Sequence, residues 1–332
     1  MKVSVPKNII EKYKTPSSLT DFQLKMYIHL IEWKWRHITT DWGEHNKEKY
    51  GAILPEEYKQ EYYPLYQPLV RDLSNHTFKL HKHFGHMASS QAACLNLFLA
   101  ILRDKKTADT ILPQINRKYK ELAIDELEGG FQFEYCDPSN PLNDHTIAAG
   151  TDADVAIAYY DTLGSLSLWL IEHKLTEDEF TTCGGYKSRG NKAKGNCGNG
   201  QLILNDHSKC YYNYHCEYKY WELSDESGIY KSQSLRNRAQ CPFIGGENQL
   251  WRNQLLGFAI KKRGLFKNVH FSVVHHPENH DLENTIARYK ELLIDKYLFE
   301  SFTLRDFITA SSTIKDKDFC SWLTWYRELY LI

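Results

Sequence analysis

Two short segments of the sequence carry residues that could do metal-assisted chemistry. TDADVAI contains Asp152 and Asp154, and WLIEHKL contains Glu172 and Lys174. Side chains two residues apart on a β-strand point to the same face, so a hairpin could bring both pairs together. Carboxylates this close repel each other unless a hard divalent cation lies between them, and Mg²⁺ prefers oxygen ligands together with water. A lysine beside such an ion can orient or deprotonate a water molecule, which suits hydrolysis of a phosphodiester.

The Glu-x-Lys spacing by itself carries little information, because it occurs three times in the chain. The copies are Glu57–Lys59, Glu172–Lys174 and Glu217–Lys219. Only the middle copy ends an apolar strand, follows a strand that bears Asp, and supplies the one basic residue of a strongly acidic segment. The alternative is that this strand simply runs out to solvent with a Glu and a Lys at its exit.

Hydrophobic periodicity and turn signals predict the elements that must position these residues. QAACLNLFLAILRD is apolar on nearly every side and follows Ser89 or Ser90 as a cap, which indicates a buried helix. FQFEYC, DADVAIAYYD, SLSLWLIEHKL and NVHFSVVHH favour strands, and DTLGS is typical of a hairpin turn. ENQLWRNQLLGFAIKKRG is typical of a second helix, ending at Gly264. The predicted core is a helix at 89–102, strands at 130–136, 153–160 and 167–175, a helix at 247–263 and a strand at 268–275.

With this order of elements and these residues, the chain resembles the PD-(D/E)XK nuclease superfamily, which has the restriction-endonuclease-like fold. The resemblance implies an α/β (α+β) protein with an αβββαβ core, in which a mixed central sheet is flanked by helices. The superfamily's acidic residue lies on the second strand and its (D/E)-x-K motif on the third, which matches Asp154 and Glu172–Lys174. The resemblance covers roughly residues 85 to 276. It implies metal-dependent cleavage of DNA or, less often, RNA, with Lys174 helping to position or activate water.

The superfamily also implies a set of metal ligands. Carried over, Asp154 and Glu172 would hold Mg²⁺ or Mn²⁺, and the backbone carbonyl of His173 would be a further ligand. Ala153 stands where the superfamily motif has proline, and Asp152 competes with Asp154 for the role of main ligand. We prefer Asp154, because the apolar run VAIAYY follows it directly.

The second core helix supplies candidate contacts to nucleic acid. The predicted binding residues are Gln249, Arg252, Asn253 and Lys261. Residues 181–270 carry fourteen Lys or Arg against six acids, whereas residues 121–180 carry fourteen acids against one basic residue. The acidic stretch would form the metal centre while the basic stretch approaches the phosphates. Both stretches could instead be ordinary solvated faces.

The remaining segments are expected to be accessory. We predict a helical N-terminal extension at 1–84, a nuclease-like core at 85–276 with an insertion at about 176–245, and a helical C-terminal extension at 277–332. Thr20 and Gln23 form a capping-box start for a helix in the first extension.

Cysteines and histidines offer weaker candidates for metal sites. Four cysteines in the insertion could hold a structural Zn²⁺ ion, namely Cys183, Cys197, Cys210 and Cys216. Their spacing includes no C-x-x-C pair, so buried free thiols are the default expectation. His81, His83 and His86 cluster before the first core helix. Without a cysteine or carboxylate partner at fixed spacing, they are expected to be ordinary packed or surface histidines.

Composition and missing motifs exclude several classes of protein. With 332 residues, 42% hydrophobic and 25% charged, the chain can bury a full core, which excludes a disordered protein. No apolar run is long enough for a membrane span and no signal-like stretch is present, so we expect a cytoplasmic protein. No Gly-Lys-Ser/Thr motif occurs, which excludes an ATP-driven motor and a nucleotide cofactor of that kind.

The sequence thus predicts a Mg²⁺-dependent endodeoxyribonuclease, restriction-like or defence-related, that acts on DNA and could assemble as a homodimer. The main alternative is a nucleic-acid-binding module of the same fold that no longer cuts. A glycosidase-like hydrolase with paired carboxylates is a further alternative, in which Lys174 would have no obvious role.

Overall fold

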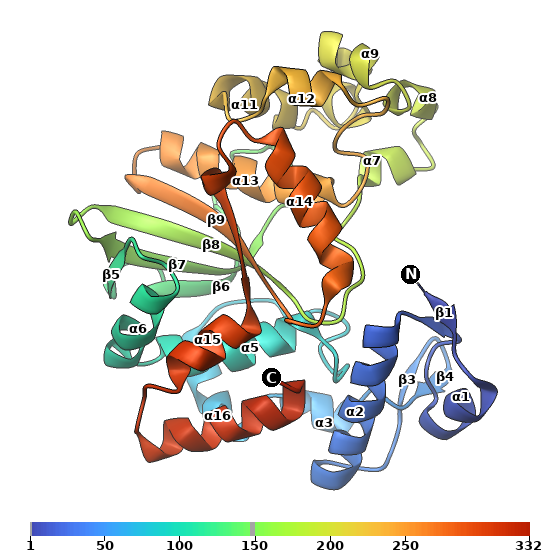
Figure 1. The fold of residues 1–332 in the computed structure, drawn as a ribbon, viewed down its shortest axis with the longest axis vertical. Helices are drawn as coiled ribbons and strands as arrows, with labels where there is room; N and C mark the ends of the chain where they lie inside the picture. Colours follow the sequence, from blue (N-terminus) through green and yellow to red (C-terminus); the bar gives the residue numbers. More distant parts are fainter. Residues whose placement is uncertain (1, 147–149) are drawn as a thin grey trace.

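A mixed sheet lies at the centre of the molecule (Figure 1). The computed structural model describes residues 2–146 and 150–332, and six strands form the main sheet within that part. Their bounds are β5 Tyr119–Leu122, β6 Phe131–Tyr135, β7 Ala153–Asp161, β8 Leu166–Lys174, β9 Asn268–His275 and β10 Phe299–Thr303. The strand order is β10–β9–β8–β7–β5, and β6 also pairs with β7. β9 is parallel to β8 and β10, whereas β5, β6 and β8 are antiparallel to β7.

The predicted core elements form in the predicted order. Helix α5 (Ser90–Leu102) precedes β6, β7 and β8, and helix α13 (Glu247–Lys262) precedes β9. The bounds agree with the sequence-based prediction to within one residue at each end. The mixed α/β architecture with an αβββαβ core is therefore confirmed.

The β7–β8 hairpin forms because its turn satisfies its own backbone. Gly164 has a φ of 78°, a left-handed conformation that glycine adopts at little cost. The Asp161 carboxylate accepts hydrogen bonds from the backbone N–H groups of Leu163 (2.9 Å) and Ser165 (2.8 Å). This turn brings the start of β7 beside the end of β8, where the predicted acidic residues lie.

Helix α5 covers one face of the sheet, and helices from both ends of the chain share its apolar core. α2 (Asp21–His37), α15 (Leu304–Ser311) and α16 (Lys317–Tyr330) belong to the same apolar core (Figure 1). Asn96, near the middle of α5, accepts a hydrogen bond from the Tyr66 N–H (2.8 Å) and donates one to the Tyr330 hydroxyl (2.9 Å). Both extensions are therefore fastened to the core. Among the described residues, none of the helices combines the length and apolarity needed to cross a bilayer.

Helix α13 covers the opposite face, with α11 (Tyr220–Ser227) and α14 (Glu283–Leu292) packed against it. The Trp251 ring of α13 stacks on Phe243 with 4.1 Å between ring centroids, and Trp221 of α11 lies at 4.9 Å. Burial of a Phe-sized side chain contributes roughly 1.5–3 kcal/mol. This aromatic cluster anchors the insertion to the core.

The insertion at 176–245 is built largely of short helices. They are α7 Gly184–Lys187, α8 Lys194–Cys197, α9 Gly200–Asn205, α10 Tyr211–Tyr214, α11 and α12 Ser232–Arg236. Most contain four to six residues, which is too short for the sequence to show a helical period.

The expectation that both extensions are helical needs correction. The C-terminal extension contains β10, which follows α14 and pairs in parallel with β9. The N-terminal extension contains two small sheets, β1 (Val3–Ser4) with β2 (Ser18–Leu19) and β3 (Gly43–His45) with β4 (Glu48–Tyr50). Its helices are α1 Lys7–Tyr13, α2, α3 Glu56–Gln60 and α4 Gln67–Val70, and the predicted capping box of Thr20 and Gln23 starts α2. β5, which lies between α6 (Lys105–Ile111) and β6, was also outside the predicted core. These strands have two to five residues, too few to establish an alternating pattern.

Candidate active site

The structure brings Asp154, Glu172 and Lys174 together at one end of the β7–β8 hairpin. Asp154 is the second residue of β7, and Glu172 and Lys174 are among the last three residues of β8. The Asp154 Oδ2 atom accepts a hydrogen bond of 2.6 Å from the backbone N–H of His173. The backbone of His173 therefore lies against the Asp154 carboxylate, between the two motif residues.

The Glu172 carboxylate is held by three side chains. Its Oε1 atom lies 2.9 Å from the Lys174 Nζ atom and accepts a hydrogen bond of 2.7 Å from Gln249 Nε2. Its Oε2 atom accepts one of 2.9 Å from Asn253 Nδ2. Only 4% of Glu172 is exposed, and burying a carboxylate this deeply is costly unless charged and polar partners contact it. The carboxylate is thus fixed in position before any ligand binds.

Lys174 keeps its positive charge in this environment. Burial lowers its pKa, but the neighbouring carboxylates of Glu172, Glu177 and Asp154 outweigh that effect and raise the pKa above its ordinary value. Lys174 therefore acts in this structure as a hydrogen-bond donor and a fixed positive charge.

Asp154 and Asp152 lie in a region with excess negative charge. Burial, followed by the charges of Glu172 and Glu134, raises the pKa of Asp154 well above its usual range. Burial and the charge of Glu172 also raise the pKa of Asp152. The single ammonium of Lys174 does not compensate for these carboxylates, so a divalent cation would relieve their repulsion.

Glu134 is a further acidic residue of this site that the sequence analysis did not single out. Phe133 pairs with Val155 and Tyr135 with Ala153, which places Glu134 of β6 across from Asp154. Gln91 Nε2 donates a hydrogen bond of 2.8 Å to Glu134 Oε1. Burial, with smaller contributions from Asp152 and Glu172, raises the pKa of Glu134 to about 7.

The oxygen donors fit a hard divalent cation. Mg²⁺ is usually bound through one or two carboxylates and retains several waters. Asp154 and Glu172 supply two carboxylates, the His173 backbone lies beside Asp154, and Asp152 is close enough for its charge to interact with that of Glu172. Within 2–146 and 150–332, no group of three or more His, Cys, Asp or Glu side chains is arranged to hold an ion by itself. The donor set therefore suits a partly hydrated Mg²⁺ or Mn²⁺ ion and not one enclosed by side chains.

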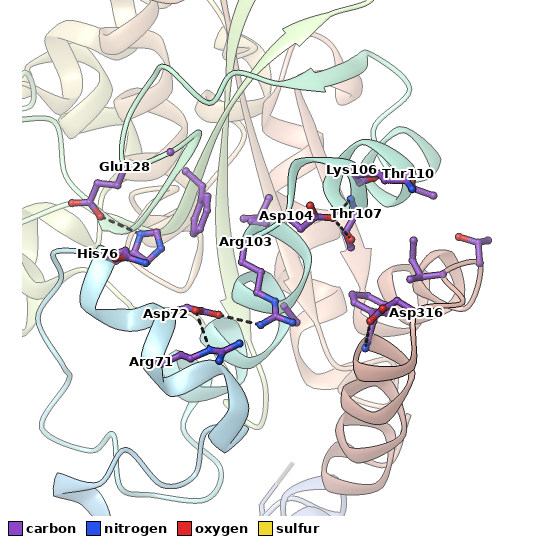
Figure 2. A pocket seen from close by; sticks show the side chains of 18 of the residues that line it. Arg71, Asp72, His76, Arg103, Asp104, Lys106, Thr107, Thr110, Glu128 and Asp316 are labelled. Atoms are coloured by element: carbon purple, nitrogen blue, oxygen red, sulfur yellow. Dashed lines mark hydrogen bonds and ion pairs between the residues drawn. The ribbon is translucent and has the colours of Figure 1, made fainter.

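A cleft of about 790 Å³ opens onto these residues. Asp154, Lys174, Glu134 and Gln91 form part of its lining. A larger cavity of about 940 Å³ is lined by other residues, at the opposite end of α5 (Figure 2). There Asp72 lies between Arg103 (3.1 Å) and Arg71 (3.7 Å), so its charged side chains largely compensate one another. The smaller cleft is the one that reaches the candidate active site.

The four residues predicted to contact nucleic acid lie at different distances from the candidate active site. Gln249 and Asn253, four residues apart on one face of α13, both donate hydrogen bonds to Glu172. Arg252 is largely buried, with its Nη1 atom 3.5 Å from the Thr151 hydroxyl. Lys261 lies twelve residues further along α13 than Gln249, roughly 18 Å at the helical rise. Gln249 and Asn253, in the first turns of α13, thus contact the site directly, whereas Lys261 is remote from it.

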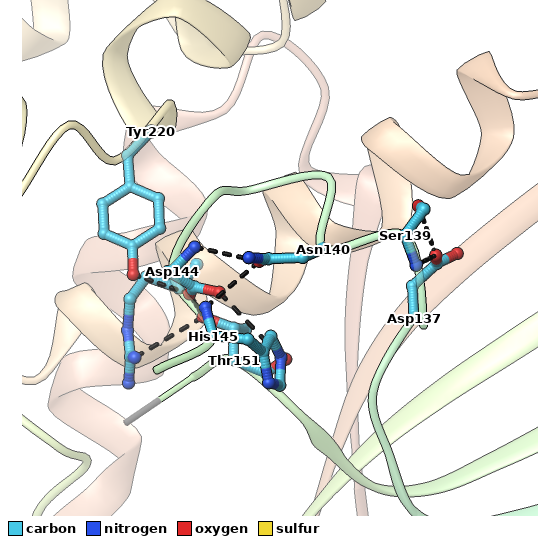
Figure 3. A network of polar contacts seen from close by, with 8 residues as sticks. Asp137, Ser139, Asn140, Asp144, His145, Thr151 and Tyr220 are labelled. Atoms are coloured by element: carbon cyan, nitrogen blue, oxygen red, sulfur yellow. Dashed lines mark hydrogen bonds and ion pairs between the residues drawn. The ribbon is translucent and has the colours of Figure 1, made fainter. Parts of the chain in front are cut away.

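A polar network holds the start of β7 against the insertion (Figure 3). The buried Asp144 carboxylate accepts hydrogen bonds from the Thr151 hydroxyl and, at 2.7 Å, from the Tyr220 hydroxyl. Asn140 Oδ1 in turn accepts from the backbone N–H of Asp144 (3.0 Å). Because Thr151 directly precedes Asp152, this network fixes the approach of the chain to the acidic residues.

The four cysteines predicted as possible zinc ligands all carry free thiols. Cys197 and Cys210 are buried, and a backbone hydrogen bond of 2.9 Å joins the Cys241 N–H to the Cys197 carbonyl. Cys183 and Cys216 are partly exposed. No three of the described cysteines stand close enough to hold an ion as they are placed, so a structural zinc site stays a prediction.

An acidic strand followed by a strand that ends in Glu-x-Lys, within this αβββαβ core, defines the class of restriction-endonuclease-like proteins. Residues 28–331 match the family described as restriction endonuclease associating with ARP, and the chain belongs to that family. Comparison with curated proteins and with solved structures gave no match. Membership confirms the resemblance drawn from the sequence and indicates a nuclease-like function.

Proposed function

We propose that the protein is a Mg²⁺- or Mn²⁺-dependent endonuclease that hydrolyses phosphodiester bonds in DNA. The observation that carries this proposal is the joint placement of Asp154, Glu172 and Lys174 at one end of the β7–β8 hairpin, where Asp154 and Lys174 line a cleft. A family described as restriction endonucleases supports DNA as the substrate and a restriction-like or defence-related role.

Asp154, Glu172 and the backbone carbonyl of His173 would hold the ion, with Asp152 as an additional acidic group. When bound, such an ion offsets negative charge on the phosphate and lowers the pKa of a coordinated water. Gln249 and Asn253 keep the Glu172 carboxylate in one orientation, so that little reorganisation is needed when substrate arrives.

Lys174 contributes a hydrogen-bond donor and a positive charge beside the proposed metal site. Its ammonium contacts the Glu172 carboxylate, and Lys174 also lines the cleft. The ammonium can therefore donate a hydrogen bond to the attacking water or to a phosphate oxygen. A fixed positive charge at this point favours the additional negative charge of the transition state.

A plasmid-cleavage assay tests the proposal. Supercoiled DNA should be nicked or linearised with Mg²⁺ and should stay intact with EDTA. Substitution of Glu172 by Gln should abolish cleavage. Lys296→Ala, which changes an exposed lysine outside the cleft lining, should cleave like the parent. Failure of the parent to cut any DNA or RNA offered, at any Mg²⁺ or Mn²⁺ concentration, would favour a nucleic-acid-binding module that no longer cuts.

A further inference from the structure

Three segments of the chain form the walls of the cleft, and Asp154 and Lys174 lie at its floor. The cleft is lined by helix α2, by residues 81–91, which lead into the start of α5, and by residues 176–187 after β8. Its volume of about 790 Å³ falls within the range of roughly 300–1,000 Å³ that is usual for pockets that enclose small ligands. Lys174, at the floor, is only 8% exposed.

We propose that this cleft takes a single DNA strand and that a duplex must open locally before it reaches the active site. The proposal rests on the proposed nuclease function and names the form of its substrate. A volume of about 790 Å³ is of the size that encloses small ligands, which leaves no room for a base-paired second strand beside the first.

The walls are fastened on both sides. Gln23 Nε2 of α2 donates a hydrogen bond of 2.9 Å to the Thr176 carbonyl, and Lys2 lies 3.1 Å from Asp178. Opposite them, the Thr181 N–H donates one of 2.9 Å to Gln249 Oε1. The N-terminal extension is therefore tied to the segment after β8, and that segment is tied to α13. These contacts hold the two sides of the cleft in position.

The charge of the lining leaves little electrostatic attraction for DNA in either form. Five acidic residues and two lysines line the cleft, a formal net charge of −3 with all five acids counted as ionised and the histidines as neutral. Proteins that bind duplex DNA gain most of their affinity from contacts between Lys or Arg and phosphates. Here that contribution is weak, so affinity must come from bound cations and from contacts to exposed bases.

Aromatic side chains in the cleft wall supply such contacts. The rings of His81 and His83 lie 5.2 Å apart, and Tyr27 packs edge-on against His86 at 5.3 Å. All four residues line the cleft. Burial lowers the pKa of His81 and of His83, so both rings are neutral at pH 7 and present a ring face without a charge. Stacking of a base on an aromatic side chain contributes about 1–3 kcal/mol, and it requires an unpaired base.

Binding measurements separate the two substrate forms. A fluorescein-labelled single-stranded DNA and its annealed duplex would be titrated with the full-length protein in Ca²⁺, and electrophoresis would show whether each DNA stays intact. We expect the single strand to bind at least about tenfold more tightly. The double variant His81→Ala/His83→Ala should lose that preference by weakening single-strand binding about tenfold, a loss typical of one stacked base. His280→Ala, which changes an exposed histidine outside the cleft lining, should bind both DNAs like the parent.

Equal or tighter binding of the duplex would overturn the proposal, and so would an unchanged preference in the double variant. Parallel reactions in Mg²⁺ keep the outcomes distinct. Cleavage of duplex DNA without any preference for the single strand would contradict only the proposed substrate form. Absence of cleavage of either DNA, despite preferential single-strand binding, would contradict the nuclease function and leave the assignment of the cleft intact.

Discussion

The Lys174 ammonium lies 2.9 Å from the Glu172 carboxylate, and both residues are more than nine-tenths buried. The two residues belong to one Glu-x-Lys motif, yet the pair is completed by Gln249 and Asn253 from a helix more than 70 residues later. The geometry of the motif thus depends on the packing of α13 against the sheet. This dependence leads to separate predictions for the charged and the amide members of the site.

Neutralising the two members of the charged pair should have opposite effects on metal binding. Glu172→Gln removes a ligand charge and should weaken Mg²⁺ binding. Lys174→Ala removes a positive charge beside the ion, so Mg²⁺ affinity should persist or increase while the cleavage rate falls by roughly 10²–10³-fold. Calorimetric titration with Mg²⁺, beside a cleavage time course, measures both effects. Loss of Mg²⁺ binding in Lys174→Ala would show that the lysine supports the fold of the site and not the reaction.

The amide side chain of Asn253 should act through Glu172. A hydrogen bond to a charged group contributes about 1.5–3 kcal/mol, so Asn253→Ala should slow cleavage roughly 10- to 100-fold. Because Asn253 touches Glu172 and not the cleft lining, kcat should fall while KM changes little. Lys296→Ala, which changes an exposed lysine outside the cleft lining, is the control. A change confined to KM would mean that Asn253 contacts the nucleic acid, as the sequence suggested.

The sequence predicted what is local and periodic. The β7–β8 hairpin follows from its apolar strands and the Asp and Gly residues of its turn, and helix α5 follows from a continuous apolar run after a serine cap. Once those elements pair, Asp154 and Glu172 must meet. Glu134 could not be selected in this way, because an acidic residue on a strand is ordinary until the register places it opposite Asp154. The roles of Gln249 and Asn253 were missed for a similar reason, since polar residues on a helix show no sign of the carboxylate they will face.

His173 should destabilise the protein through its side chain. Its imidazole is fully buried, and among the described residues neither ring nitrogen has a hydrogen-bond partner. Burial, together with the positive charge of Lys174, lowers its pKa to about 3, so the ring is neutral. An unsatisfied buried polar group costs about 1–3 kcal/mol, so His173→Leu should raise the free energy of unfolding by about that amount.

His276→Leu provides the control for that measurement by chemical denaturation. The His276 ring is also buried, but its Nε2 atom lies 2.8 Å from the Tyr330 carbonyl and its Nδ1 atom accepts from the Glu278 N–H (3.1 Å). This substitution should lower stability, because both backbone groups lose a partner. Equal effects of the two substitutions would contradict the assignment of different environments to the two histidines.

His276 should also contribute to the pH dependence of stability. Burial lowers its pKa from 6.5 to about 4, although the Tyr330 carbonyl and Glu278 act in the opposite direction. Between these two values the unfolded chain binds a proton that the folded chain does not, so the contribution of His276 is complete above pH 6.5 and is lost as the pH falls toward 4.

The corresponding measurement compares the parent with His276→Gln. Glu134 has the opposite effect in part of this range, because its folded pKa is raised to about 7. Because Glu134 is present in both proteins, the difference between their stability–pH slopes isolates the contribution of His276. Unfolding free energies at about pH 5 and pH 6 should rise more steeply in the parent, by up to about 1.4 kcal/mol per pH unit. Identical slopes would mean that the His276 ring titrates normally in the folded protein.

The central claim is that Asp154 belongs to a metal-dependent cleavage centre, and a single time course tests it most directly. Parent, Asp154→Asn and Asp152→Asn proteins would be incubated with DNA and Mg²⁺ after circular dichroism has shown that all three are folded. We predict that the parent cuts, that Asp154→Asn does not, and that Asp152→Asn retains measurable activity. Normal cleavage by Asp154→Asn would contradict the account, and with an inactive Asp152→Asn it would move the metal ligand to Asp152.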